Sequence, residues 1–301
     1  MQINGVRIID TYAEAFRLFG TRFIITAATK EWAMEAAGKA TGFATSIIAC
    51  GCEADVEGEV ENTPDGRPGV AVLLFAADVQ QLEQQVVDRV GQCVMTCPTA
   101  ACFNGLVSPN TIMVGGKLRF FGDGWQCSKL LGEIRYWRIP VMEGEFLVEE
   151  TFGYCREAAD GNLLILGKDA KSTLGAARTA VEAMRQIPGV ILPFPGGIVR
   201  SGSKVGSRYK FLKASTFTAF CPTLRGQVET LIPEGVNAVL EIVNCGLSME
   251  AVRRSLTAGI IAACQPGVVE ITAGNYGGKL GEFKIYLHEL LESFSKSSSD
   301  S

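Results

Sequence analysis

Residues 69–75 read GVAVLLF and residues 235–243 read GVNAVLEIV, and these two stretches decide the fold. Both are mainly apolar runs that begin at a glycine, which predicts strands covered on both faces. The two glycines lie 166 positions apart, and apolar positions in the segments that follow keep this offset: Val86 and Val252, Val90 and Leu256, Val94 and Ile260. Because these positions recur every four residues, they predict the buried face of a helix. The recurrence indicates an internal duplication.

The segments around these two strands have the same order of strands and helices in both halves of the chain. In the first half, a strand at 23–25 precedes a helix capped by Thr29, Gly42 ends that helix before a strand at 45–48, and Asp78 caps the next helix. The apolar face of the first of these helices consists of Trp32, Ala36, Ala37 and Ala40.

The second half has the same order of elements. A strand at 163–166 precedes a helix, Pro188 breaks that helix before a strand at 190–192, and Ser248 caps the last helix. The apolar face of the earlier helix consists of Leu174, Ala177, Val181 and Met184. We therefore predict an α/β (α+β) protein of two tandem ferredoxin-like, split βαβ lobes. The predicted proximal lobe spans 1–148, the distal lobe 149–292, and a serine-rich disordered tail 293–301.

Composition excludes several classes of function. The 301 residues carry 28 basic and 32 acidic side chains, a net charge of −4 that gives no general attraction to nucleic acid. His288 is the single histidine, so a zinc site with several histidines cannot be built. No run approaches the roughly 18 apolar residues of a membrane span, and the N-terminal segment lacks a signal-peptide core. We expect a cytoplasmic protein without membrane or nucleic-acid partners.

The ten cysteines do not form a recognisable site in the sequence. Cys50 and Cys52, and likewise Cys93, Cys97 and Cys102, match neither zinc spacing nor a thioredoxin motif. Small buried thiols are the favoured interpretation, and a metal or cluster site is the alternative.

Glu241 breaks the repeat. The offset of 166 places it opposite Phe75, so a carboxylate replaces an apolar residue in a strand that is otherwise apolar on both faces. Burial raises the pKa of an unpaired carboxyl, and acid–base chemistry near neutral pH uses such groups. We therefore predict that Glu241 is catalytic; the alternative is an edge strand from which Glu241 points into water.

Two glycine-rich stretches could bind a ligand or simply form turns. Residues 193–207 read PFPGGIVRSGSKVGS, which departs from a phosphate-binding loop because serine intervenes before Lys204. Residues 273–281 read AGNYGGKLG. Arg208, Lys210 and Lys213 join Arg200 and Lys204 in a basic cluster, which is either solvated surface or a site for a partner with several carboxylates.

Long segments across the chain, taken together, resemble formylmethanofuran:tetrahydromethanopterin formyltransferases. They include INGV, TAATKEWA, TPDGRPGV, GQCVMTCPTAACFNGL, PFPGGIV, SGSKVGS, IPEGVNAV and PGVVEITAGNYGGKLG. The resemblance implies that a formyl group moves between the amine of a methanofuran-type carrier and a ring amine of a tetrahydromethanopterin-type pterin. It implies that Glu241, in the segment matching E-I-V, is the acid–base residue, and that no metal or cofactor is permanently bound.

The candidate substrate-binding residues come from the matching glycine-rich segments and from GQCVMTCPTA. They are Gln92, Thr96, Phe194, Pro195, Gly196, Gly197, Arg200, Ser201, Ser203, Lys204, Asn275 and Lys279. The resemblance further implies a homo-oligomer, with a tetramer expected, whose partners are the one-carbon carriers. The chain is similar to the bacterial branch, in which the enzyme is a subunit of a formyltransferase/hydrolase complex, so hydrolase subunits are expected partners. The competing hypothesis is a non-catalytic pterin-binding or scaffold subunit of a one-carbon transfer complex.

Overall fold

The computed structural model describes residues 1–279 and 281–299, which form a mixed α/β protein. The chain divides into two compact units, each described here by itself. The central unit comprises Leu18–Ala158, and the terminal unit comprises Met1–Arg17 together with Ala159–Ser301.

The central unit is a sheet with helices packed against it. Its sheet runs in the order β5, β6, β4, β7, β11, β10, β9, and neighbours are antiparallel except for β7 and β11. The strands are β4 (Arg17–Thr26), β5 (Glu53–Val60), β6 (Gly69–Ala76), β7 (Ala101–Asn104), β8 (Thr111–Met113), β9 (Cys127–Leu131), β10 (Ile134–Val141) and β11 (Gly144–Glu149). The helices are α1 (Lys30–Thr41), α2 (Ile47–Cys50), α3 (Val79–Arg89), η1 (Val90–Val94), α4 (Gly115–Leu118) and η2 (Arg119–Gly122).

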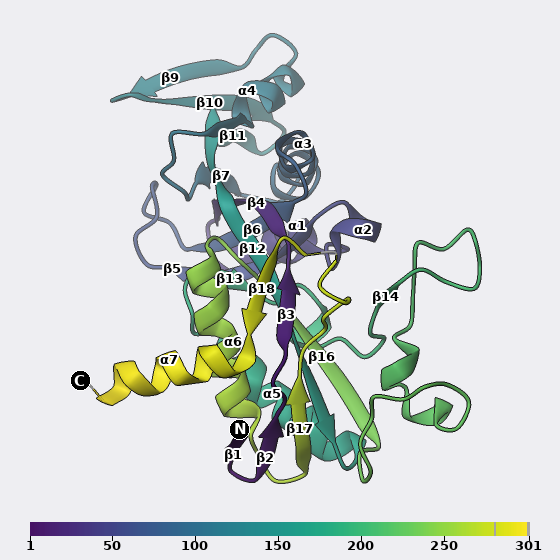
Figure 1. Ribbon diagram of the computed structural model, residues 1–301. Coiled ribbons are helices and arrows are strands. Elements are labelled where there is room, and N and C mark those ends of the chain that lie inside the picture. The colour runs from purple at the N-terminus through teal and green to yellow at the C-terminus, as the bar shows by residue number, and fades with distance from the viewer. Residues whose placement is uncertain (280, 300–301) are drawn as a thin grey trace. The chain divides into compact units, whose positions relative to one another are not determined.

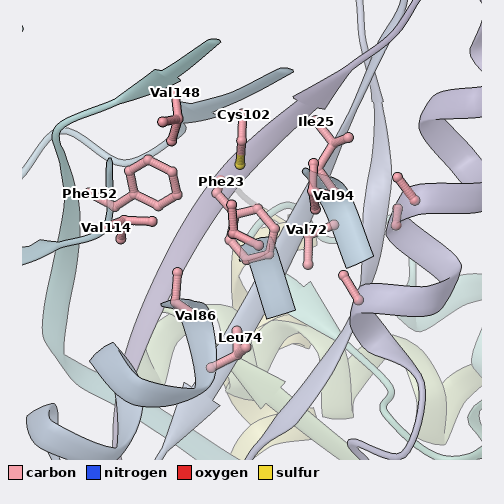
Figure 2. Packing of buried hydrophobic residues seen from close by; sticks show 14 of the residues in the cluster. Phe23, Ile25, Val72, Leu74, Val86, Val94, Cys102, Val114, Val148 and Phe152 are labelled. Carbon is pink, nitrogen blue, oxygen red and sulfur yellow. The ribbon is translucent and has the colours of Figure 1, made fainter. Parts of the chain in front are cut away.

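The predicted caps and apolar faces build the core of this unit. The Thr29 side chain accepts a hydrogen bond from the Trp32 N–H at the start of α1, and Asp78 accepts one of 2.8 Å from the Gln81 N–H at the start of α3. Every residue of β6 is buried. Figure 2 shows Phe23 among side chains from the sheet and from α3, including Leu74 and Val86. Trp32 is 44% exposed, so the alanines of α1 alone face the sheet.

The predicted strand at 45–48 is wrong. Residues 47–50 form the short helix α2, which ends at Gly51 in the left-handed region, with φ of +79°. The second strand of the unit is β5, eight residues further along, whose sequence EADVEGEV is acidic. Its alternate side chains pack on the core, while its acidic residues lowered its apparent strand propensity.

The terminal unit repeats this construction. Its sheet runs in the order β1, β2, β17, β12, β16, β13, and neighbours are antiparallel except for β2 and β17. The strands are β1 (Gln2–Ile3), β2 (Val6–Ile8), β3 (Tyr12–Ala15), β12 (Thr151–Gly167), β13 (Val190–Ile191), β14 (Lys204–Val205), β15 (Ala214–Ser215), β16 (Ala238–Gly246), β17 (Val268–Thr272) and β18 (Phe283–Tyr286). Residues 151–158 of β12 belong to the central unit, and its remaining residues belong to the terminal unit. The helices are α5 (Ala170–Met184), η3 (Pro195–Gly197), η4 (Thr218–Phe220), η5 (Pro222–Leu224), α6 (Met249–Ala263) and α7 (Leu287–Ser299).

Helices and irregular chain cover different faces of this sheet. Helices α5 and α6 pack on the face that carries Leu163, Ile165 and Ile242 (Figure 1). Leu164 and Leu166 point to the other face, where Ile232 from the segment before β16 packs on them. The alternation of side chains along β12 and β16 thus separates an α-helical core from a face covered by loops.

Two boundaries differ from those predicted. Residues 1–17 belong to the terminal unit because β2 pairs with β17 and β3 with β18, whereas the sequence placed them in the first lobe. The segment predicted as a disordered tail from 293 continues α7 through Ser299, since buried Leu290 and Leu291 anchor this helix. Positions 300 and 301 lie outside the described residues.

Candidate active site

The terminal unit contains a pocket of about 900 Å³ on the loop-covered face of its sheet. Its lining combines the end of β17, the glycine-rich segment after it, and the segments at 204–205 and 217–233. The lining residues that carry polar or charged groups are Arg7, Thr11, Lys204, Thr230, Glu270, Thr272, Asn275, Tyr276 and Lys279. A concave, partly apolar site with a few polar groups is the usual form of a small-molecule site.

Glu241 lies on the pocket side of this sheet. Leu164 of β12 is the register partner of both Glu241 on β16 and Thr272 on β17. Directly opposed residues point to the same face of a sheet, so Glu241 shares a face with Thr272, which lines the pocket. The strand β16 runs between β12 and β13, and the backbone of Val199 also pairs with Glu241. These pairings exclude the edge-strand alternative.

Burial controls the protonation of Glu241. The residue is 7% exposed, and burial raises the pKa of its carboxyl to about 7. No hydrogen bond from the described residues offsets this effect. A carboxyl with a pKa near 7 exists in both protonation states at neutral pH, as a general acid–base group requires.

Tyr276 is a pocket residue whose pKa is affected by the charge of Glu241. Burial raises the pKa of its hydroxyl to about 12, and the nearby carboxylates of Glu241, Asp160 and Glu14 act in the same direction. A hydrogen bond from the side chain of Asn162 opposes this shift. The phenol therefore stays protonated and can donate a hydrogen bond.

Asn162 and Glu14 hold the segment that carries Tyr276. The Oδ1 atom of buried Asn162 accepts a hydrogen bond of 2.8 Å from the Gly274 N–H. The carboxylate of Glu14, 1% exposed, accepts hydrogen bonds from the N–H groups of Gly278 and Gly281, the latter at 2.7 Å. At Gly278, φ is +68° and a Cβ atom would lie 2.6 Å from the Tyr12 hydroxyl oxygen, so this position requires glycine.

The structure brings together part of the predicted set. Lys204, Asn275 and Lys279 line this pocket, and the Asn275 side chain donates a hydrogen bond of 2.7 Å to the Thr11 hydroxyl. The segment after β13 holds the remaining candidates of this unit, Phe194, Pro195, Gly196, Gly197, Arg200, Ser201 and Ser203, none of which lines the pocket. Arg200, Ser201 and Ser203 are exposed.

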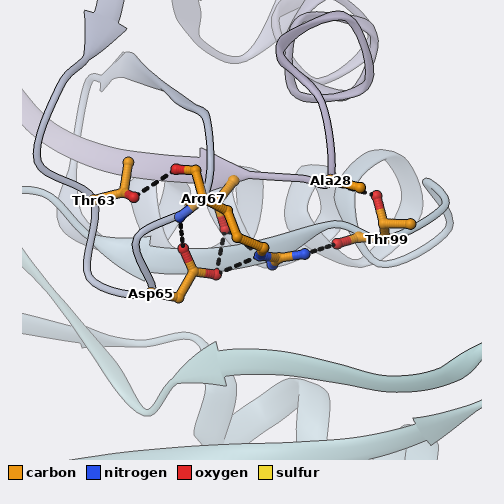
Figure 3. A network of polar contacts seen from close by, with 6 residues as sticks. Ala28, Thr63, Asp65, Arg67 and Thr99 are labelled. Atoms are coloured by element: carbon orange, nitrogen blue, oxygen red, sulfur yellow. Dashed lines mark hydrogen bonds and ion pairs between the residues drawn. The ribbon is translucent and has the colours of Figure 1, made fainter.

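Gln92 and Thr96 lie in the central unit, where they line a second pocket of about 950 Å³. Arg67 at its wall is fixed by Asp65 and by the Thr99 carbonyl oxygen (Figure 3). Thr99 has a φ of +63° and its N–H donates a hydrogen bond of 2.8 Å to Glu143. This pocket therefore has a rigid polar wall beside apolar residues such as Phe121 and Met95.

The sequence missed Tyr276, Asn162, Glu14 and the ion pair between Arg7 and Glu270 at the pocket wall. Tyr276 could have been found from the sequence, because it lies inside the glycine-rich stretch at 273–281. Glu14 and Arg7 could not, because β2 and β3 reach the site only through long-range pairing.

Within residues 1–279 and 281–299, no group of three or more histidine, cysteine, aspartate or glutamate side chains is arranged to hold a metal ion. In the same range, no helix has both the length and the apolarity to cross a membrane. His288 contacts the Ile8 carbonyl oxygen at 2.9 Å and does not line the pocket.

Comparison with known families covers almost the whole chain. A family model described as formylmethanofuran–tetrahydromethanopterin formyltransferase matches residues 1–141, and a second, described as the proximal lobe of the same family, matches residues 144–290. The word proximal thus belongs to the second half in that description, whereas the prediction above used it for residues 1–148.

Individual relatives agree. A formylmethanofuran–tetrahydromethanopterin formyltransferase from Methylococcus capsulatus is 54% identical over 97% of this chain and 100% of its own length. The fold matches a chain in the crystal structure of the formyltransferase/hydrolase complex from Methylorubrum extorquens with methylofuran, with a TM-score of 0.94, 50% identity and coverage of 97% of this chain and 98% of that one. It also matches the formyltransferase from Methanosarcina barkeri, with a TM-score of 0.90, 49% identity and coverage of 96% and 100%.

Proposed function

The chain belongs to the formylmethanofuran–tetrahydromethanopterin formyltransferase family and is a formyltransferase, and we propose that Glu241 is its acid–base residue. The two carriers are its co-substrates: a methanofuran-type amine and a ring amine of a tetrahydromethanopterin-type pterin. The observation that carries the proposal is the position of Glu241, buried in β16 with a pKa of about 7 and facing the same side as pocket residue Thr272.

Formyl transfer has three parts that side chains at this site can assist. The acceptor amine attacks the formyl carbon, the carbonyl oxygen gains negative charge, and the departing amine takes up a proton. Protonated Glu241 gives that proton, and the carboxylate then recovers one from the attacking amine. The Tyr276 hydroxyl, which stays protonated, donates a hydrogen bond to the developing oxyanion. Both carriers are held in one ternary complex, so proximity replaces a covalent intermediate.

The carriers are assigned to surfaces by charge. Lys204 and Lys279 line the pocket, and Arg200, Arg208, Lys210 and Lys213 are exposed nearby in the chain. This cluster suits the glutamate-rich tail of a furan carrier. One carrier is proposed to bind the turn after β13, through Phe194, Pro195, Gly196, Gly197, Ser201 and Ser203. Gln92 and Thr96, which line the second pocket, remain proposed substrate contacts.

The two compact units are proposed to be ferredoxin-like lobes that arose by duplication, one in Leu18–Ala158 and the other in Met1–Arg17 together with Ala159–Ser301. The support is the sheet order. Strands β4, β5, β6 and β7 are arranged as β7, β4, β6, β5, and strands β12, β13, β16 and β17 as β17, β12, β16, β13. In both sets the fourth and third strands flank the first, which is the split βαβ arrangement.

We further propose a cytoplasmic homotetramer without a permanently bound cofactor, whose larger assembly includes hydrolase subunits. The match to a chain of the formyltransferase/hydrolase complex from Methylorubrum extorquens supports the hydrolase partners.

Two assays on the purified full chain test the function. Binding of a tetrahydromethanopterin-type pterin is measured by calorimetry, and formyl transfer from a formylated furan carrier is followed by the absorbance of the formylated pterin. We expect both binding and transfer with the wild type, and binding alone with Glu241→Gln. Glu234→Gln, at an exposed position that follows pocket residue Pro233 but does not itself line the pocket, is the matched control and should keep both. Pterin binding without transfer by the wild type would contradict the proposal and favour a non-catalytic subunit.

A further inference from the structure

The charge of one arginine reaches three cysteines of the central unit, none of which itself lines either pocket. Arg89, at the end of α3, donates hydrogen bonds from Nη1 to the carbonyl oxygens of Ala40 and Gly42, at 2.6 and 2.9 Å, and from Nε to Gln85 at 3.2 Å. The guanidinium is therefore fixed in place. Its charge acts on Cys50, Cys52 and Cys93.

Cys50 and Cys52 have opposite environments. Cys50 ends α2, is half-buried, and its Sγ atom lies 3.7 Å from the Thr45 hydroxyl. Burial would raise the pKa of the Cys50 thiol, but backbone N–H groups of Ser46 and Thr45, the Thr45 hydroxyl and Arg89 together lower it. Cys52 is fully buried, its Sγ donates a hydrogen bond of 3.2 Å to Gln85, and burial raises its pKa to about 11.

The backbone between these cysteines favours a bridge. Only Gly51 separates them, and its φ of +79° bends the chain in a left-handed turn. Two steps of about 3.8 Å between Cα atoms span at most about 7.6 Å when straight, so the bend at Gly51 allows a separation within the roughly 4.4–6.8 Å that disulfides use. An accessible thiol beside a second thiol and a fixed cation is the arrangement of a redox-sensitive site.

We propose that Cys50 and Cys52 form a peroxide-responsive modification site, with Cys50 as the reacting thiol and Cys52 as the resolving one. The Cys50 thiolate attacks one oxygen of a hydroperoxide, so an S–O bond forms, the O–O bond breaks, and the departing oxygen takes a proton. Cys52 then loses its proton and attacks the sulfenic sulfur. The S–S bond forms, the S–O bond breaks and water leaves; the two sulfurs lose two electrons, which the peroxide gains. This site is independent of the proposed formyl transfer.

The test uses the reduced, folded full chain. Brief alkylation with limiting iodoacetamide at pH 7, followed by peptide mass spectrometry, compares Cys50 with Cys127, which is exposed in β9 and serves as an internal control. We expect Cys50 to react at least about threefold faster, although it is less exposed. In a separate sample that has not been alkylated, equimolar hydrogen peroxide should yield a peptide with a Cys50–Cys52 disulfide that dithiothreitol reverses.

Two variants locate the roles of the thiols. In Cys52→Ser, peroxide with dimedone should label Cys50 as a trapped sulfenic acid, and in Cys50→Ser neither the label nor the disulfide should form. If Cys52→Ser does not fold, the disulfide map of the wild type decides the question. A rate at Cys50 no greater than at Cys127, or a bridge from Cys50 to Cys93 in place of Cys52, would overturn the proposal.

Discussion

Replacing Glu241 by glutamine should stabilise the fold at alkaline pH and lose most of this advantage in acid. The pKa of Glu241 rises from 4.5 to about 7 because the folded protein buries the carboxyl. Below pH 4.5 the carboxyl is protonated in both the folded and the unfolded chain. As the pH rises from 4.5 to 7, the unfolded chain releases this proton first, so the wild type loses stability. Glutamine stays neutral throughout and avoids that loss.

The expected size follows from the two pKa values. Between pH 5 and pH 8 the wild type should lose about 2.5 kcal/mol of unfolding free energy relative to Glu241→Gln, since each pKa unit corresponds to about 1.4 kcal/mol. Urea titration of both proteins at the two pH values, at one protein concentration, measures this double difference. Glu234→Gln, whose side chain is exposed, is the control and should follow the wild type. A difference between Glu241→Gln and wild type that does not change with pH would refute the burial of an ionisable carboxyl at this position.

Three further predictions concern the pocket and the core. Tyr276→Phe should lower kcat by about 10²-fold with little change in either KM, because it removes one hydrogen-bond donor to the oxyanion; an unchanged kcat would exclude that role. Lys204→Gln combined with Arg208→Gln should raise the KM of the furan carrier far more than that of the pterin, and this effect should shrink in added salt. Equal effects on the two KM values would show that the basic cluster does not bind the furan carrier. Phe152→Ala removes a buried ring whose centroid lies 6.1 Å from that of Phe23, and it should reduce the unfolding free energy by about 3–5 kcal/mol. Phe211→Ala, at an exposed site, should change the unfolding free energy by less than about 0.5 kcal/mol in the same urea titration.

The sequence repeat predicted the helix starts and many buried positions, because both depend on the pattern of neighbouring residues. The helices after Asp78 and Ser248 begin where their caps predicted, and Val252, Leu256 and Ile260 are all buried in α6 as the offset of 166 requires. Acidic β5 escaped detection, since an apolar pattern was the only signal used for strands. The N-terminal strands were placed in the wrong unit because parallel pairing of β2 with β17 leaves no trace in neighbouring residues.

The candidate site was predictable only where the chemistry interrupts a pattern. Glu241 stood out because it occupies the place of Phe75 in an apolar strand, and the structure buries both residues. Lys204, Asn275 and Lys279 were found because they lie in glycine-rich segments, and all three line a pocket. Glu14 was not found, because its two hydrogen bonds to Gly278 and Gly281 join positions more than 260 residues apart.

The pH dependence of kcat in the wild type and in Glu241→Gln tests the central claim most directly. The wild type should show an ionisation near pH 7, where Glu241 titrates. In Glu241→Gln, kcat should fall by about 10²–10⁴-fold, both KM values should be largely kept, and that ionisation should disappear. A variant within about tenfold of the wild type that retains the ionisation near pH 7 would contradict an acid–base role for Glu241.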